Sequence, residues 1–241
     1  MQLQIKYLYN YMYNIFFFTL FLFSSFVNSN SILLDTNNTL LLRGEINEKL
    51  ATQFIFELNK KSKKNNLYVY LDTNGGSVDA GNKIVNEIQK HDLTCIAQKA
   101  ISMGFVILQS CDKRYITPLA TLMQHQMSYG IINEKVKVES YVEYIQQIGN
   151  ELTLMQARKI GISPKKFNEK TYNDWWSFGK NAIENNCADE IIDVTCSTKL
   201  TNATYEIDNG MHVYTYSKCP LVTGFIDKKE KDKKGDYFYF M

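Results

Sequence analysis

The fold of this chain is most constrained by two transitions from strand to helix. Residues 74–78 (Asn-Gly-Gly-Ser-Val) and 100–104 (Ala-Ile-Ser-Met-Gly) each follow a short β-branched or aromatic run, and each opens an amphipathic run. Strands and helices that alternate across such turns are typical of an α/β protein. Successive βαβ units make right-handed crossovers, so we expect a mainly parallel sheet.

Hydrophobic periodicity predicts the remaining elements. We expect strands at 39–46, 66–73, 93–97, 114–117, 121–124 and 191–192, and helices at 47–64, 77–91, 102–110, 135–161 and 181–186. The helix at 135–161 is the longest and carries an apolar stripe made of Val138, Tyr141, Val142, Ile145, Ile148, Leu152 and Met155. Because so regular a stripe is costly to leave in water, we expect it to be buried between subunits.

Ser102 stands at the start of a predicted helix that is apolar on nearly every side, which indicates a buried helix. A helix N-terminus presents unpaired N–H groups and favours negative charge. The pair Gly75-Gly76, at the end of a neighbouring strand, lets bare backbone approach a bound molecule. These are the ingredients of an acyl-transfer site. From these residues alone, an N-cap serine and a turn glycine pair are the simpler interpretation.

The first thirty residues differ from the rest of the chain. Lys6 is their only charged residue, an apolar run covers 15–23, and small polar residues continue through Ser31. This layout predicts a secretory signal peptide at 1–29, with cleavage after Val-Asn-Ser, and a location in the secretory pathway or outside the cell. The alternative is an uncleaved membrane anchor, although the strongly apolar core is shorter than the roughly 20 residues of a spanning helix.

Secretion would make two sequons and five cysteines relevant. Asn37 and Asn202 each begin an N-glycosylation sequon. The five cysteines can form two disulfides and leave one thiol, in a pairing that stays open: Cys95, Cys111, Cys187, Cys196 and Cys219. No Cys-x-x-Cys pair or nearby histidine supports a zinc site, so we expect no metal and no cofactor. A net charge of +2 gives no basic footprint for nucleic acid.

Four blocks of sequence resemble the proteolytic subunit of the Clp protease family. They are residues 71–78, 100–104, 123–126 and 172–174, and their order and rough spacing agree with the family pattern. The resemblance covers about residues 39–194 and outweighs the simpler interpretation of Ser102. It implies a ClpP/crotonase-like α/β fold, a spiral of βαβ units with a protruding long helix, here 135–161.

The resemblance also implies roles for individual residues. Ser102 would be the nucleophile, His125 the general base, and Asp174 the group that orients the imidazole. The backbone N–H groups of Gly76 and Met103 would form the oxyanion hole. The chemistry is consistent, because a serine hydroxyl is inert until a histidine takes its proton.

The function implied is that of a serine endopeptidase that acts on extended or unfolded peptides as a homo-oligomeric ring. The peptide would add as a strand beside Gly75 and Gly76. Two other hypotheses stay open. One is a catalytically silent Clp-like scaffold subunit. The other is a secretory enzyme similar to a signal-peptide peptidase, with a Ser–Lys pair for which Lys99 is the nearest candidate, although the presence of His125 and Asp174 argues against it.

Several positions depart from the family pattern. Asn74 and Met127 stand where the family has proline, and Asn173 stands where many members carry an arginine that helps to join rings. The region before Thr39 is too short for the usual axial loops that meet an ATP-driven unfoldase, which argues against an ATPase partner.

The predicted organisation has three parts. A signal peptide covers 1–29, a ClpP-like serine peptidase domain covers 30–196, and a weakly ordered C-terminal appendage with one hairpin covers 197–241.

Overall fold

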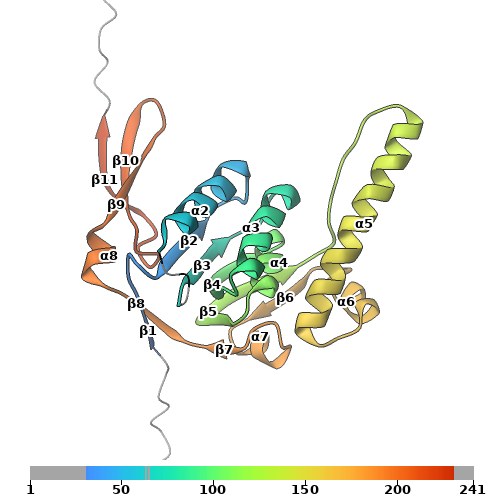
Figure 1. Ribbon diagram of the computed structural model, residues 1–241, viewed down its shortest axis with the longest axis horizontal. Coiled ribbons are helices and arrows are strands. Elements are labelled where there is room, and N and C mark those ends of the chain that lie inside the picture. Colours follow the sequence, from blue (N-terminus) through green and yellow to red (C-terminus); the bar gives the residue numbers. More distant parts are fainter. Residues whose placement is uncertain (1–30, 63, 65, 231–241) are drawn as a thin grey trace, which may run out of the picture. The chain divides into compact units, whose positions relative to one another are not determined.

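Strands and helices alternate through most of the chain (Figure 1). The computed structural model describes residues 31–62, 64 and 66–230, which belong to one compact unit that begins at Ser31. The strands are β1 (Ser31–Leu34), β2 (Thr39–Arg43), β3 (Tyr68–Thr73), β4 (Thr94–Ile101), β5 (Arg114–Gln124), β6 (Trp175–Phe178), β7 (Glu190–Ile191), β8 (Asp193–Cys196), β9 (Thr204–Asp208), β10 (His212–Ser217) and β11 (Phe225–Glu230). The helices are α2 (Glu48–Lys60), α3 (Val78–Lys90), α4 (Met103–Ser110), α5 (Lys135–Ile160), α6 (Pro164–Thr171), α7 (Lys180–Glu184) and α8 (Thr198–Asn202).

The central sheet has six strands in the order β2-β3-β4-β5-β6, with β7 also paired to β5. Strands β2 to β5 run parallel, and β6 runs antiparallel to β5. The predicted α/β class and the mainly parallel sheet are therefore confirmed. In a parallel sheet the carboxyl ends of neighbouring strands meet at one edge, and turns that follow those strands lie close together.

The sheet is buried on both faces, as the near-continuous apolar runs of its strands require. Alternate residues of β3 illustrate this, because Val69 and Leu71 pack in the main core with α2, α3 and α4. Tyr70, between them, packs on the opposite face with Leu34 of β1 and Leu200 of α8.

Side-chain caps explain where several helices begin. The Oδ1 of Asn47 accepts from the N–H of Leu50 at the start of α2. Ser77 Oγ accepts from the N–H of Ala80 at the start of α3. Ser163 caps α6 in the same way, with a proline at the first helical position. Such caps satisfy backbone donors that have no partner inside the helix.

Before residue 197, the sequence prediction missed four elements, namely β1, α6, β6 and β8. Only a short turn was expected where α6 lies, although Ser163-Pro164 is a typical helix start. The two short strands expected around Pro118 are one continuous strand, β5. The register between β4 and β5 shifts at this point, and that irregularity accommodates the proline within a strand.

The residues after 196 hold more regular structure than the single hairpin that we expected. They form α8 and an antiparallel sheet with the order β11-β10-β9. A disulfide joins Cys196 to Cys219, and the Arg43 guanidinium donates to the carbonyls of Pro220 and Val222. These contacts with residues earlier in the chain help to order the segment. Its own hydrophobic pattern is weak and therefore did not predict the sheet.

Disulfides account for four of the five cysteines. Besides Cys196–Cys219, a second disulfide joins Cys95 of β4 to Cys111 at the end of α4. Cys187 is the free cysteine and is buried. The pairing that the sequence left open is thereby assigned in this structure.

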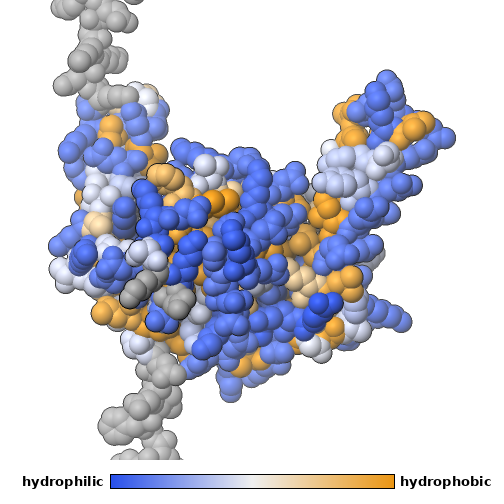
Figure 2. Space-filling model, viewed as in Figure 1, coloured by the Kyte–Doolittle hydropathy of each residue, from blue (hydrophilic) through white to orange (hydrophobic). Residues whose placement is uncertain are grey.

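Helix α5 extends away from the sheet, on the side opposite the β9–β11 sheet (Figure 1). Near its C-terminal end Ala157 and Ile160 are buried. In the part farther from the sheet, Val136 is 73% exposed and Tyr144 is 52% exposed. Figure 2 shows hydrophobic residues exposed among hydrophilic ones on this part of α5.

Of the predicted stripe, Ile145 is buried and Leu152 and Met155 pack against the core of the same chain, so this part does not need a second subunit to cover it. The apolar surface that is uncovered in the single chain lies nearer the start of α5.

The predicted signal peptide, its cleavage site and the membrane-anchor alternative lie outside the described residues, as do residues 231–241 of the appendage. Among the residues that are described, no helix combines the length and the apolar character that a membrane crossing demands.

A buried guanidinium ties the last part of the sheet to the core. Arg114, at the start of β5, forms an ion pair with Asp189. The side chain of Arg114 is only 2% exposed, whereas that of Asp189 is 38% exposed. Its guanidinium also donates to Gln109 Oε1 and to the carbonyl of Asn186. Burial raises the pKa of Asp189, but the hydrogen bonds and charge of Arg114 outweigh burial and hold that pKa below 3.8.

We predict that Asp189→Asn lowers the free energy of unfolding by about 1–3 kcal/mol at neutral pH, because it leaves the buried guanidinium without a counter-charge. The lower figures allow for the partial exposure of the carboxylate. Since the folded pKa lies below the unfolded one, the stabilisation is complete above about pH 4 and is lost as the pH falls through the folded pKa. The difference in the free energy of unfolding between wild type and variant should therefore disappear in acid.

Denaturant unfolding of both proteins between neutral pH and acid measures this difference. The matched control is Glu48→Gln, which removes the exposed pair Lys83–Glu48 and should cost less than about 1 kcal/mol. A difference between wild type and Asp189→Asn that stays constant into strong acid contradicts the prediction.

Candidate active site

Ser102 occupies a strained turn between β4 and α4. Its φ is 56° and its ψ is −119°, a conformation that residues with a side chain rarely adopt. Its N–H donates to the carbonyl of Met123 in β5 (2.8 Å), and its carbonyl accepts from the N–H of Phe105 (2.9 Å). The backbone is therefore held from both sides. The hydroxyl makes no capping bond to α4, so the simpler N-cap interpretation is wrong.

The Ser102 hydroxyl instead meets a histidine. His125 is the first residue after β5 and is half-buried. Its Nε2 lies 2.8 Å from Ser102 Oγ, within hydrogen-bond distance. Because β4 and β5 are paired, the ends of both strands bring these two side chains to the same sheet edge. This arrangement is that of a nucleophile next to a general base.

Asp174 lies near this pair in the backbone but does not join it through its side chain. The antiparallel register pairs Gln124 with Trp175, so one further step along the two strands sets His125 opposite Asp174. The Asp174 side chain is exposed, and its φ of 51° is in the left-handed region. Among the described residues, no hydrogen bond joins it to His125.

Two glycines bring bare backbone against the serine. Gly75 has a φ of +90°, and a Cβ built on it would lie 2.8 Å from Ser102 Cβ. Gly76 has a φ of +145°, and a Cβ there would meet the carbonyl oxygen of Ile46 at 2.3 Å. Both positions therefore require glycine. Thr73, which was not among the predicted site residues, fixes this turn, because its hydroxyl accepts from the N–H of Gly75 at 3.0 Å.

The predicted oxyanion-hole donors are available. In the part of the chain that the structure describes, the N–H groups of Gly76 and Met103 make no backbone hydrogen bond. Met103 is the first residue of α4, so its N–H is among those that a helix leaves without an internal partner. Both residues line the same cleft as Ser102. Two such donors can stabilise negative charge on an oxygen bound there.

The cleft over Ser102 has a volume of about 500 Å³, in the range of ligand-binding sites. The start of α4, the segment after β5 and the facing side of α5 form its walls. Val106, Ile145 and Phe167 supply apolar surface, and the buried amides of Gln124 and Gln156 supply polar surface. Neither glutamine was among the predicted site residues: Gln124 lies in the block 123–126, where only His125 was given a role, and Gln156 belongs to no motif.

Two other side chains could be considered as the reactive group or its base. Burial raises the pKa of the free cysteine, Cys187, to about 11, so its thiol stays protonated at neutral pH and is a poor nucleophile. The Lys99 ammonium lies 3.7 Å from a carboxylate oxygen of Asp72. The base within hydrogen-bond distance of Ser102 is His125.

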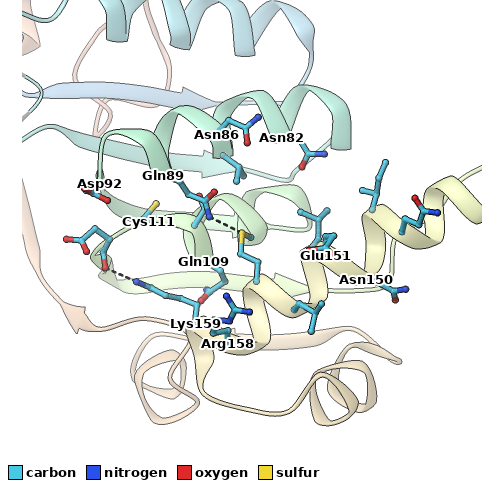
Figure 3. Close-up of a pocket in the computed structure, with 18 of the residues that line it drawn as sticks. Asn82, Asn86, Gln89, Asp92, Gln109, Cys111, Asn150, Glu151, Arg158 and Lys159 are labelled. Atoms are coloured by element: carbon cyan, nitrogen blue, oxygen red, sulfur yellow. Dashed lines mark hydrogen bonds between the residues drawn. The ribbon is translucent and has the colours of Figure 1, made fainter.

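A larger hollow of about 1400 Å³ lies between α3, α4 and α5 (Figure 3). Lys159 crosses it to the carbonyl of Asp112, and Gln89 reaches the sulfur of Met155. Neither Ser102 nor His125 lines this hollow, so it is separate from the candidate site. Across the described residues, no cluster of three or more His, Cys, Asp or Glu side chains could hold a metal ion.

Comparisons with known proteins agree with this geometry. A family model described as Clp protease matches residues 25–195. ATP-dependent Clp protease proteolytic subunit 2 of Tropheryma whipplei (strain Twist) is 29% identical over 154 residues, which are 61% of this chain and 86% of that protein. The ATP-dependent Clp protease proteolytic subunit of Streptococcus sanguinis (strain SK36) is 27% identical, over 64% of this chain and 84% of that protein. Its counterpart in Streptococcus pneumoniae (strain Hungary19A-6) is 29% identical, over 64% and 83%. The predicted ClpP/crotonase-like fold is confirmed.

The contact between Gly75 and Ser102 leads to a prediction. Gly75→Ala should abolish labelling of Ser102 by a fluorophosphonate probe, because a Cβ 2.8 Å from the serine Cβ must displace it. Gly44→Ala is a matched control, since Gly44 has nearly the same φ (+89°) but nothing within 4 Å of the added atom. Gly44→Ala should lose about 1–2 kcal/mol of stability to the positive φ, and Gly75→Ala should lose more, because its added Cβ would also lie 2.6 Å from the carbonyl oxygen of Ile101. Equal labelling of both variants would contradict the prediction.

Proposed function

The chain belongs to the Clp protease family, and we propose that it is a serine endopeptidase that cuts extended or unfolded peptides. Membership implies peptidase activity. The observation that carries the proposal is the 2.8 Å distance between Ser102 Oγ and His125 Nε2, in a turn beside two unpaired N–H groups. A peptide would lie as an extended strand beside Gly75 and Gly76.

The proposed mechanism follows from these positions. His125 Nε2 takes the proton of the Ser102 hydroxyl as its oxygen attacks the peptide carbonyl. The negative oxygen of the tetrahedral intermediate accepts hydrogen bonds from the N–H groups of Gly76 and Met103. His125 then gives its proton to the leaving amine. Water, activated by His125 in turn, hydrolyses the acyl-enzyme and restores the serine.

Asp174 would complete the triad by holding the imidazole in the correct tautomer. Its position opposite His125 in the strand register supports this role. The carboxylate must first turn inward, because its side chain is exposed in this structure. That same observation favours the second candidate function, a catalytically silent Clp-like subunit. Peptide hydrolysis by the purified chain separates the two.

The uncovered apolar surface of α5 supports assembly into a homo-oligomeric ring. Val136 and Tyr144 are largely exposed in the single chain, and a helix with such a surface gains free energy from burial. Asn173 lacks the positive charge of an arginine at the ring junction, but an exposed ion pair contributes only about 0–1 kcal/mol. Burial of α5 would therefore outweigh this loss.

The proposed peptidase works in the secretory pathway or outside the cell, without an ATPase partner. Two disulfides fit an oxidising compartment. Asn37 and Asn202, the proposed glycosylation sites, are both exposed. Since ATP-driven unfolding is not expected there, its substrates would be short or already unfolded chains.

We predict that Ser102→Ala and His125→Ala each lower kcat/KM for an unstructured peptide by about 10⁴-fold or more, since members of a triad act as a unit. Fluorogenic peptides of varied sequence provide the assay. His91→Ala is the matched control for His125→Ala, because His91 lies at the end of α3, away from the cleft, and its loss should leave hydrolysis unchanged. Hydrolysis that survives Ser102→Ala would exclude the serine mechanism.

A second prediction concerns processing and assembly. The chain expressed through a eukaryotic secretory route should begin near Asn30 and carry N-glycans on Asn37 and Asn202, and it should be larger than a monomer. Denatured mass before and after glycosidase treatment tests the first two points, and light scattering tests the third. An intact Met1 on soluble protein, unmodified asparagines, or a monomer would each refute the corresponding part.

A further inference from the structure

The backbone of His125 is held by an unusual contact. Strand pairing between β5 and β6 ends at Gln124 and Trp175, so no ladder extends to the next residue. The N–H of His125 donates instead to Oε1 of Gln124, the side chain that precedes it, at 3.0 Å. A hydrogen bond to the neighbouring side chain therefore takes the place of an inter-strand hydrogen bond at His125, the first residue after β5.

Gln124 is held in turn by helix α5. Its Nε2 donates to Oε1 of Gln156 at 2.5 Å. The Nε2 of Gln156 donates to the carbonyl of Leu152, one turn earlier in α5, at 2.9 Å. A continuous chain of hydrogen bonds thus runs from the main chain of α5 to the main chain of His125.

Packing alone does not explain this pair of glutamines. Gln124 is 5% exposed and Gln156 is 2% exposed, and both line the cleft that contains Ser102. Buried amides cost free energy unless they are hydrogen-bonded. Two apolar side chains of similar size could fill the same space at nearly no loss of stability. The amides need another reason to be there.

We propose that Gln124 and Gln156 are positioning residues that hold His125 Nε2 at its 2.8 Å distance from Ser102 Oγ. This inference rests on the proposed function. Catalytic groups that are displaced by even 1 Å can lose about 100-fold in rate, so a restraint on the base has a direct effect. The same hydrogen bonds also link the position of α5 to the position of His125.

The test uses Gln156→Met in the full chain, which removes the acceptor for Gln124 but keeps the length of the side chain. The rate of fluorophosphonate labelling is measured from about pH 5 to about pH 9, where a histidine titrates. The rate should fall about tenfold to 100-fold, and the midpoint of its pH profile should shift. With a peptide substrate, kcat should fall while KM stays the same.

Two further variants test the hydrogen-bond chain itself. Gln124→Met should cause a similar loss, and the double variant should lose no more than either single one, because both break the same chain. Gln156→Glu keeps the accepting oxygen and should retain more labelling than Gln156→Met. The matched control is Gln147→Met, an exposed glutamine on α5 outside the cleft, which should react like wild type.

Several results would overturn the proposal. They are a wild-type rate and pH profile in Gln156→Met, a loss no larger than the fraction unfolded in a thermal melt, or a change in KM alone. If the wild-type chain does not react at all, the proposed function fails instead. The pair is then tested by NMR titration of the His125 ring, and identical titration in wild type and Gln156→Met would refute it.

Discussion

The site depends on one constraint, the positive φ of Ser102 at the junction of β4 and α4. A residue with a side chain adopts this conformation only when its surroundings impose it. Here β5 holds its N–H, α4 holds its carbonyl, and Gly75 leaves room for its Cβ. The turn directs the hydroxyl toward His125 instead of onto the helix that it begins. In the proposed enzyme, two neighbouring parallel strands would thus supply the nucleophile and the base, and the glycine turn after a third would supply a backbone donor.

The residues of the candidate site are only partly brought together in the single chain. In the single chain, Ser102 Oγ lies within hydrogen-bond distance of His125 Nε2, and among the described residues the N–H groups of Gly76 and Met103 make no backbone hydrogen bond. Asp174, in contrast, is exposed, and no hydrogen bond joins it to His125 in the described part of the chain. In the proposed enzyme, the third member of the triad would have to turn inward for catalysis. The Gln124–Gln156 pair, in contrast, ties the histidine to α5 in the structure as it stands. Helix α5 would therefore serve both the proposed assembly and the positioning of the base.

Much of the fold follows from local sequence. The apolar periodicity of α2 and α3 and the β-branched runs of β3 and β4 predict those elements, because burial of one stripe or both faces dictates the pattern. Strand β6 was missed because its four residues carry little pattern of their own and depend on pairing with β5. After residue 196 the sequence predicted one hairpin but not the three-stranded β9–β11 sheet, because Cys196–Cys219 and the contacts of Arg43 help to order this segment. Ser102 and His125 could be identified through family blocks. The contact between Gln124 and Gln156 could be identified only from the structure, because the two residues lie 32 positions apart in the sequence.

In the proposed enzyme, every step depends on Ser102 as the reactive nucleophile. The most direct test of this role is to treat the purified protein with diisopropyl fluorophosphate and to locate the adduct by peptide mass spectrometry. We expect a single modified site, in the peptide that contains Ser102, and no adduct when His125 is replaced by alanine. An adduct on any other serine, or none on the folded wild-type chain, would contradict this role.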